Sequence, residues 1–379
     1  WHAKTRELMI RELSDHLPSH PLIPADGRLN TELWGDWNRE QGQSMEGVLD
    51  LRDAELPGEP DSLRVDHVNT RFKWQFLTRK SWRLDFSGFR IDQAGAPWSS
   101  DRLTLERNIP GNLGLWVSAD LLEVAFPLEL TQRIMSVYET PWPRNVPRSA
   151  SGSVTGFDLV LDRRWKLYMT AGKFESVSAT DWGRWPSVTG LRGDVDLLAG
   201  SGQTTVQGRD VRVEWPRNFR RPLIADFPSC TLDIGWGDRW QVHVRDCSLE
   251  NDLIRAHGRL NFAQTEGKPA VDVNVAIDHA KVADLDPYWP HALIKPRVSD
   301  WLSACLVGGQ VTGGQLSLRG DRDDWPFTGY EGQLEASVEF EGLVLDYYPG
   351  WPRAAGASGS AIFRGQSMIV DAALSDLSG

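Results

Sequence analysis

The stretch Val271-Asp272-Val273-Asn274-Val275-Ala276-Ile277-Asp278 places an apolar side chain at every second position. Successive side chains of a β-strand point to opposite faces, so this period of two predicts a strand with one apolar and one solvent-facing side. Such one-sided strands are typical of antiparallel sheets, because parallel sheets are usually covered on both faces. The apolar members of the stretch are Val271, Val273, Val275 and Ile277.

Two further segments repeat this alternation on either side of the first. One contributes Phe157, Leu159 and Leu161, and the other contributes Leu334, Ala336, Val338 and Phe340. Shorter runs with the same period occur at residues 63–67, 74–76, 82–86, 211–215 and 316–318. We therefore expect a mostly β, antiparallel chain in which the three apolar sets share one face.

Three segments interrupt the β pattern with apolar residues at helical spacing. Residues 5–16 and 120–138 predict the first two helices, and Pro127 is expected to bend or split the second one. Residues 297–307 predict the third, with Pro296 at its start and Gly308-Gly309 at its end. The helices are expected to be few and short.

The dipeptide Trp-Pro recurs along the chain at residues 142, 185, 215, 289, 325 and 351. The copies at 185 and 351 extend to the pattern Trp-Pro-x-x-x-Gly-x-x-Gly, each before an expected pair of strands. A residue before proline favours extended geometry, so these dipeptides mark strand ends and favour an elongated, solenoid-like sheet. The expected segments are 1–148 (an N-terminal helix and a β-meander with a helical interruption), 149–295 (β), 296–310 (helical) and 311–379 (β).

Composition excludes several classes of protein. A net charge of −11 disfavours nucleic-acid binding, and the nearest basic cluster is only Arg217, Arg220 and Arg221. No uncharged apolar stretch reaches the roughly 18 residues of a membrane span. The chain opens at Trp1 without a signal peptide, so we expect it to be part of a longer protein.

A search for catalytic or metal-binding motifs finds none, which predicts a protein that is not an enzyme and has no cofactor. His16 and His20 have the spacing of a helical ligand pair, but Pro18 between them disfavours a metal site. The dipeptides Asp66-His67 and Asp278-His279 lie on expected strands, where neighbours point apart. The acidic cluster Asp321, Asp323 and Asp324 is interpreted as a solvated turn, because Arg319 and Arg322 balance its charge.

A series of segments from about residue 150 onward resembles the YhdP branch of the AsmA-like family. They are LDPYWP at 285–290, PRVSDWL at 296–302, GGQVT at 308–312, LSLRG at 316–320, WPF at 325–327, GQLEA at 332–336 and YYPGWP at 347–352. Gly152, Gly156 and the Trp185-Pro186 element fit the same pattern. Before residue 150 the resemblance is vague.

The resemblance implies a segment of a large protein that is anchored in the inner membrane of a Gram-negative bacterium and extends across the periplasm. Such proteins are similar to bridge-like lipid transfer proteins, in which a long curved sheet forms an open hydrophobic groove. The expected function is to carry phospholipid acyl chains between the inner and outer membranes, which parts outside this piece would contact. An envelope scaffold or outer-membrane assembly factor is the alternative. The three apolar sets are the candidate groove residues.

Cys230 and Cys247 lie on the two arms of an expected hairpin with the turn residues Gly235-Trp-Gly-Asp238. If the hairpin is symmetric about Asp238 and Arg239, the two cysteines face each other and could form a disulfide, which an oxidising periplasm would favour. A bulge would send the thiols to opposite faces, and two buried free thiols are the other possibility. Cys305 is expected to stay unpaired.

Overall fold

The structure is a computed structural model of the 379-residue chain. It describes residues 1–12, 23–38, 42–57, 62–78, 80–93, 96–109, 113–143, 146–181, 183, 185–237, 239–265, 268–292, 294–321, 324–325, 327, 331–365 and 367–378. The chain divides into two compact units. Residues 1–183 and 194–199 form the first, and residues 184–193 and 200–379 form the second, so the boundary falls within β10 (Ser187–Leu198).

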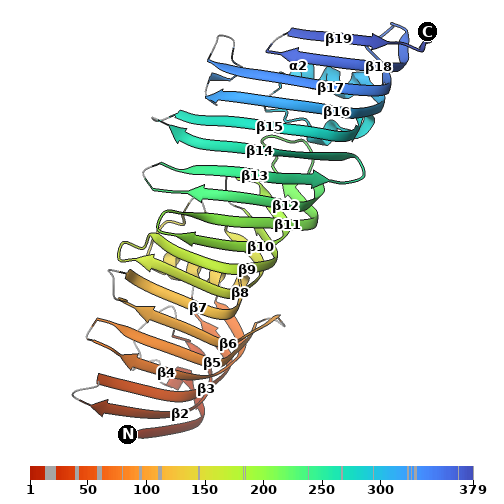
Figure 1. Ribbon diagram of the computed structural model, residues 1–379. Helices are drawn as coiled ribbons and strands as arrows, with labels where there is room; N and C mark the ends of the chain where they lie inside the picture. The colour runs from red at the N-terminus through yellow and green to blue at the C-terminus, as the bar shows by residue number, and fades with distance from the viewer. Residues whose placement is uncertain are drawn as a thin grey trace. The chain divides into compact units, whose positions relative to one another are not determined.

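The first unit is an antiparallel meander in which each strand pairs with the next along the chain, from β1 to β9 (Figure 1). The strands are β1 (His2–Met9), β2 (Asp26–Asn38), β3 (Gly42–Leu56), β4 (Leu63–Phe76), β5 (Trp82–Gln93), β6 (Ala96–Arg107), β7 (Leu113–Glu123), β8 (Ser149–Asp162) and β9 (Leu167–Thr180). A short 3-10 turn, η1 (Ile10–Glu12), follows β1, and α1 (Ala125–Val137) lies in the connection between β7 and β8.

The second unit repeats this plan from β11 to β19, and β18 also pairs with β20. The strands are β11 (Ser201–Glu214), β12 (Leu223–Gly235), β13 (Gln241–Glu250), β14 (Ile254–Thr265), β15 (Lys268–Lys281), β16 (Leu306–Asp321), β17 (Gly332–Leu345), β18 (Arg353–Arg364), β19 (Ser367–Ala373) and β20 (Asp376–Ser378). The connection between β15 and β16 holds η2 (Val282–Asp284), η3 (Asp286–Tyr288) and α2 (Pro296–Cys305). The expectation of a mostly β, antiparallel chain with a few short helices is confirmed.

The helix expected at residues 5–16 was wrong as far as the structure describes it. Residues 2–9 form β1, which pairs Thr5 with Thr31 and Leu8 with Leu29. The register shifts between these pairs, where Glu7 has a φ of 52°. This irregularity interrupts the period of two by which the strand could have been recognised. Residues 13–16 lie outside the described part of the chain.

The other two expected helices are present with corrected bounds. Leu121 and Leu122 belong to β7, where they pair with β8, and α1 begins only at Ala125. Pro127 does not split α1, because it lies in the first turn, where a missing N–H costs no intrahelical hydrogen bond. The third helix ends at Cys305, and the expected terminal glycines lie inside β16, where Gly309 has a φ of +97° beside shifts in register.

Candidate functional site

An apolar row crosses the second unit from strand to strand. Directly paired residues of an antiparallel sheet point to the same face, so the register shows which side chains are neighbours. Val273 of β15 pairs with Leu260 and Leu318, and Leu318 pairs with Leu334 of β17. The whole row reads Thr204, Leu232, Val244, Leu260, Val273, Leu318 and Leu334. The sets from β15 and β17 therefore lie on one face, joined through β16.

Parallel rows widen this surface on both sides, and together they form what we call the second apolar face. One row holds Val206, Cys230, Cys247, Gly258, Val275, Leu316, Ala336, Phe363 and Met368, and another holds Ile234, Val242, Phe262, Val271 and Gly320. A third holds Ala256, Ile277, Gly314, Val338, Ala361 and Val370. Val273, Leu318 and Leu334 are only partly buried, so the described chain does not seal the middle of this face.

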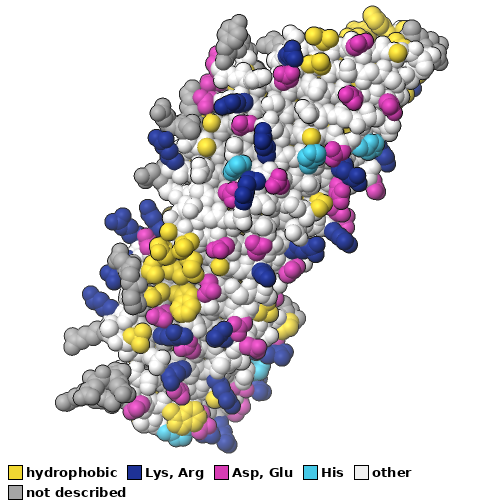
Figure 2. Space-filling view, in the orientation of Figure 1, with side chains coloured by type: hydrophobic (Ala, Val, Ile, Leu, Met, Phe, Trp, Pro, Cys, Tyr) yellow, Lys and Arg dark blue, Asp and Glu magenta, His cyan; other side chains and the backbone are white. Residues whose placement is uncertain are grey.

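The opposite face of the same strands is polar. Its central row pairs Arg259, Asn274, Ser317, Glu335 and Arg364 across successive strands. Figure 2 shows charged and histidine side chains scattered over this region, with few hydrophobic ones among them. A hollow of about 540 Å³ on this side is lined mainly by polar side chains, which makes it a poor site for hydrocarbon. The second unit therefore has one polar, solvent-facing side and one apolar side.

One end of the second apolar face is closed by the connection between β15 and β16, whose helix α2 is seen behind β16 and β17 in Figure 1. Val282 and Leu285 of this connection are buried in a cluster with Phe340, and Ile277 and Val338 of the face pack against that cluster. The connection thus covers the ends of the strands nearest to it.

Polar contacts hold this connection to β12 and to two neighbouring connections. The Tyr288 hydroxyl lies 3.4 Å from the Ile224 carbonyl oxygen of β12. The Trp301 Nε1 donates a hydrogen bond to the Tyr347 carbonyl oxygen at 3.1 Å, beyond β17. Asp300 forms a 2.7 Å ion pair with Arg220, which lies between β11 and β12. The cover is therefore anchored at several points across the unit.

The first unit has an apolar face of its own, which we call the first apolar face. Leu159 of β8 pairs with Val117, and the row continues through Leu105 and Leu84 to Trp74. A neighbouring row holds Leu33, Gly47, Phe72, Phe86, Leu103, Ala119 and Phe157, and Leu161 pairs with Leu115 and Leu167. The third expected set thus lies on this face, in a different unit from the other two.

The connection that carries α1 packs against the first apolar face. Phe126 joins a cluster with buried Trp98 and Ile91, and the Phe126 and Trp98 ring centroids are 6.2 Å apart. Gln93 donates a hydrogen bond to Glu129 of α1 at 3.2 Å. In both units, therefore, a helical connection covers part of an apolar face, and other members of that face are only partly buried.

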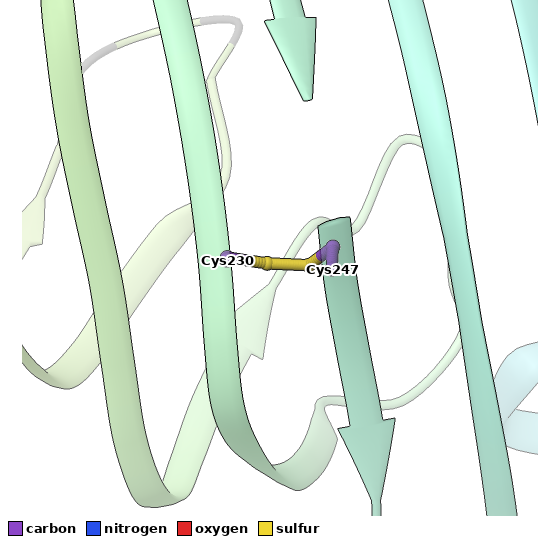
Figure 3. The surroundings of a disulfide bond; sticks show 2 residues. All are labelled: Cys230 and Cys247. Carbon is purple, nitrogen blue, oxygen red and sulfur yellow. A yellow bond between two sulfur atoms is a disulfide. The ribbon is translucent and has the colours of Figure 1, made fainter. Parts of the chain in front are cut away.

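Cys230 and Cys247 lie on the second apolar face and are joined by a disulfide, with their Cα atoms 4.1 Å apart (Figure 3). Such a short separation is typical of the closer, non-hydrogen-bonded type of cross-strand pair. Cys305 is a free, buried thiol at the end of α2, and burial raises its pKa. The bridge therefore ties β12 to β13 within the second apolar face.

The remaining sequence candidates that the structure describes do not come together in a reaction centre. His67 lies 3.5 Å from Asp50 and 3.9 Å from Asp92, rather than against its neighbour Asp66. Asp278 pairs with His257 of β14 at 3.2 Å. His16, His20, Arg322 and Asp323 lie outside the described residues. Within the described ranges, no group of three or more His, Cys, Asp or Glu side chains could hold a metal ion, and no helix is long and apolar enough to cross a membrane.

Sequence reasoning missed the members of the second apolar face on β14. Ala256, Gly258, Leu260 and Phe262 mix small and large side chains, so their alternation is weak when read alone. Cross-strand pairing to Val273 and Val275 reveals their place. What identifies these β14 residues is their cross-strand partners on β15, which a single sequence does not reveal.

Comparison with known proteins adds an independent finding. The family model described as YhdP protein matches residues 11–379. The chain is 24% identical over 311 residues to the intermembrane phospholipid transporter YhdP of Escherichia coli strain K12. That alignment covers 77% of the chain and 24% of the relative, so the chain spans about a quarter of that protein's length. No solved structure matches the chain.

Proposed function

The chain belongs to the YhdP protein family, and from this membership and its two apolar faces we propose that it carries phospholipid acyl chains along those faces. The observation that supports this most directly is the row from Leu232 to Leu334, which stays apolar across successive strands and is not sealed by the described chain. A large apolar surface that stays accessible marks a site for a ligand, a partner or a membrane.

The physical chemistry of such a face suits a ligand that must bind and still move. Each methylene that leaves water for an apolar surface gains about 0.8 kcal/mol. The hydrophobic effect has no preferred direction, so an acyl chain can shift from strand to strand along the row without breaking specific bonds. The polar opposite face keeps the sheet compatible with water. We infer that the segment works in the periplasm, between the inner and outer membranes.

The alternative is a non-catalytic scaffold or outer-membrane assembly factor, which would need the stable sheet but no lipid. The two functions differ in what the purified chain should contain. Native mass spectrometry of the chain should detect bound phospholipid if it is a conduit. A chain that carries no phospholipid, and takes up none from vesicles, would favour the scaffold.

A pair of neighbouring substitutions makes the test specific to the face. Val273→Asp places a charge in the middle of the second apolar face, whereas Asn274→Asp places one on the polar face of the same strand. Val273→Asp should abolish the phospholipid adduct because burying a carboxylate against hydrocarbon is costly, and Asn274→Asp should retain it. Both variants should be folded and should show a cooperative thermal unfolding transition. If Val273→Asp unfolds the chain while Asn274→Asp does not, Val273 belongs to a closed core, and the lipid proposal fails at this position.

A further inference from the structure

A notch interrupts the second apolar face at the end of β16 and the start of β17. Gly320 pairs directly with Gly332, and Gly320 also pairs with Val271 of β15. The same row carries the large side chains of Phe262 and Val242 farther along. Two paired glycines therefore leave a gap, two strands wide, where the rest of the row is filled by hydrocarbon.

The ring of Phe327 fills this gap. Phe327 is not on a strand but in the connection between β16 and β17. A Cβ atom on Gly320 would lie 2.7 Å from this ring, and a Cβ atom on Gly332 would lie 2.5 Å from it. Both distances are too short for real side chains, so the ring occupies the space that ordinary residues at these positions would need.

The backbone of Phe327 adopts an unfavourable conformation to place the ring there. Its φ is 55°, in the left-handed region that a bulky side chain rarely adopts. The ring contacts Trp325 edge-on, with centroids 5.3 Å apart, and the Phe327 N–H donates to the Asp324 carbonyl oxygen at 2.9 Å. The ring fills the notch only while the Phe327 backbone holds this strained conformation. An apolar ligand that replaced the ring would therefore relieve the strain.

We propose that the notch over Gly320 and Gly332 is an acyl-chain subsite of the second apolar face, and that Phe327 occupies it when no lipid is bound. This inference rests on the proposed function. The chemistry favours hydrocarbon, because the floor is glycine backbone paired in the β16–β17 ladder, and the adjoining row holds Val271 and Phe262. The notch is also continuous with the row through Val271, so an acyl chain that lies along that row can extend into the notch.

The substitution Phe327→Ala tests the subsite by removing the competing ring. The probe is phosphatidylethanolamine carrying a fluorescent acyl chain, presented in dioleoylphosphatidylcholine vesicles. If Phe327 fills the notch in most molecules, its removal should tighten lipid binding about three- to tenfold. The reason is that the notch is then open to lipid in a larger fraction of the molecules. Tyr348→Ala, in an exposed part of the β17–β18 connection, should leave the affinity unchanged.

A second substitution should reverse the gain. Gly332→Leu in the Phe327→Ala background refills the notch from its floor and should return the affinity to that of the original chain. If the original chain binds lipid and Phe327→Ala binds it equally, the subsite is wrong and the proposed function stands. If neither binds lipid, both proposals fail. If Phe327→Ala lowers the melting temperature strongly and binds no better, Phe327 is a core residue and not a displaceable plug.

Discussion

Cys230 lies directly opposite Cys247, although the register near the turn is shifted by one residue from that of a hairpin symmetric about Asp238 and Arg239. Near the turn, Gly235 pairs with Gln241 and Ile234 pairs with Val242. Continued without interruption, this register would place Cys230 opposite Asp246 and send the Cys247 side chain to the polar face. One extra residue in β13 between Val244 and Cys247 corrects the register and brings the two sulfurs together.

Chemical modification should count the thiols directly. Iodoacetamide applied to the unfolded, unreduced protein should modify one cysteine, Cys305, and should modify three after reduction. Intact mass distinguishes the two results. Three modified thiols without reductant would show that the bridge does not form in the purified protein.

The bridge should also contribute to stability. It joins residues 17 apart, and cross-linking a loop of this size stabilises a protein by about 3 kcal/mol through the entropy of the unfolded chain. The double variant Cys230→Ala with Cys247→Ala should lose roughly that much in urea unfolding. A reductant should destabilise the original chain similarly and leave the double variant unaffected. Equal sensitivity of both proteins to reductant would contradict a stabilising bridge.

The same hairpin shows what a single sequence can and cannot predict here. Alternation over Leu232 and Ile234 and over Val242 and Val244 predicted both strands, because one face of each must be apolar. The symmetric register was wrong near the turn, because the position of a bulge depends on pairing with the neighbouring strands on both sides. The helix expected at residues 5–16 failed for a related reason, since β1 has an irregular register against β2.

For the apolar faces, too, the sequence predicts some features and not others. Period two predicted which side of β15 and of β17 is apolar, but the link between them runs through Leu316 and Leu318 and needs the register of β16. The Phe327 plug was not predictable, because nothing in a local pattern indicates that a loop residue folds over two paired glycines. Local periodicity thus predicts elements and faces, and long-range pairing decides which residues meet.

Trp301 of α2 should contribute more to stability than Trp351, which contacts the same residue, Tyr347. Its ring is partly buried, its Nε1 donates to the Tyr347 carbonyl oxygen, and its ring meets the Tyr347 ring edge-on. Trp301→Ala should lower the free energy of unfolding by about 2 kcal/mol, less than a fully buried aromatic would cost. Trp351 contacts the same tyrosine but is 65% exposed, so Trp351→Ala should be nearly neutral. Urea unfolding of the two variants makes the comparison, and equal losses would contradict an anchoring role for Trp301.

Asp85 of β5 should make the first unit sensitive to acid. Thr104, which is buried, donates a hydrogen bond to Asp85 at 2.8 Å, and the Arg83 guanidinium donates at 2.9 Å. Burial alone would raise the pKa of Asp85, but the hydrogen bonds from Arg83 and Thr104 and the charge of Arg83 outweigh it and lower the pKa. The folded state therefore favours the ionised carboxylate.

The pH dependence follows from the sign of that shift. A carboxylate whose pKa is lowered by folding contributes its stability above the unfolded pKa of about 3.9, and loses it as the pH falls through the lower folded value. Asp85→Asn should therefore cost about 1 kcal/mol at pH 7, and the difference from the original chain should shrink below about pH 4. Asp120→Asn is the control, because the ion pair of Asp120 with Arg102 is exposed to water and should contribute little. Thermal unfolding of the three proteins from pH 7 to pH 3 tests this, and a constant difference between Asp85→Asn and the original chain would show that the charge of Asp85 does not stabilise the fold.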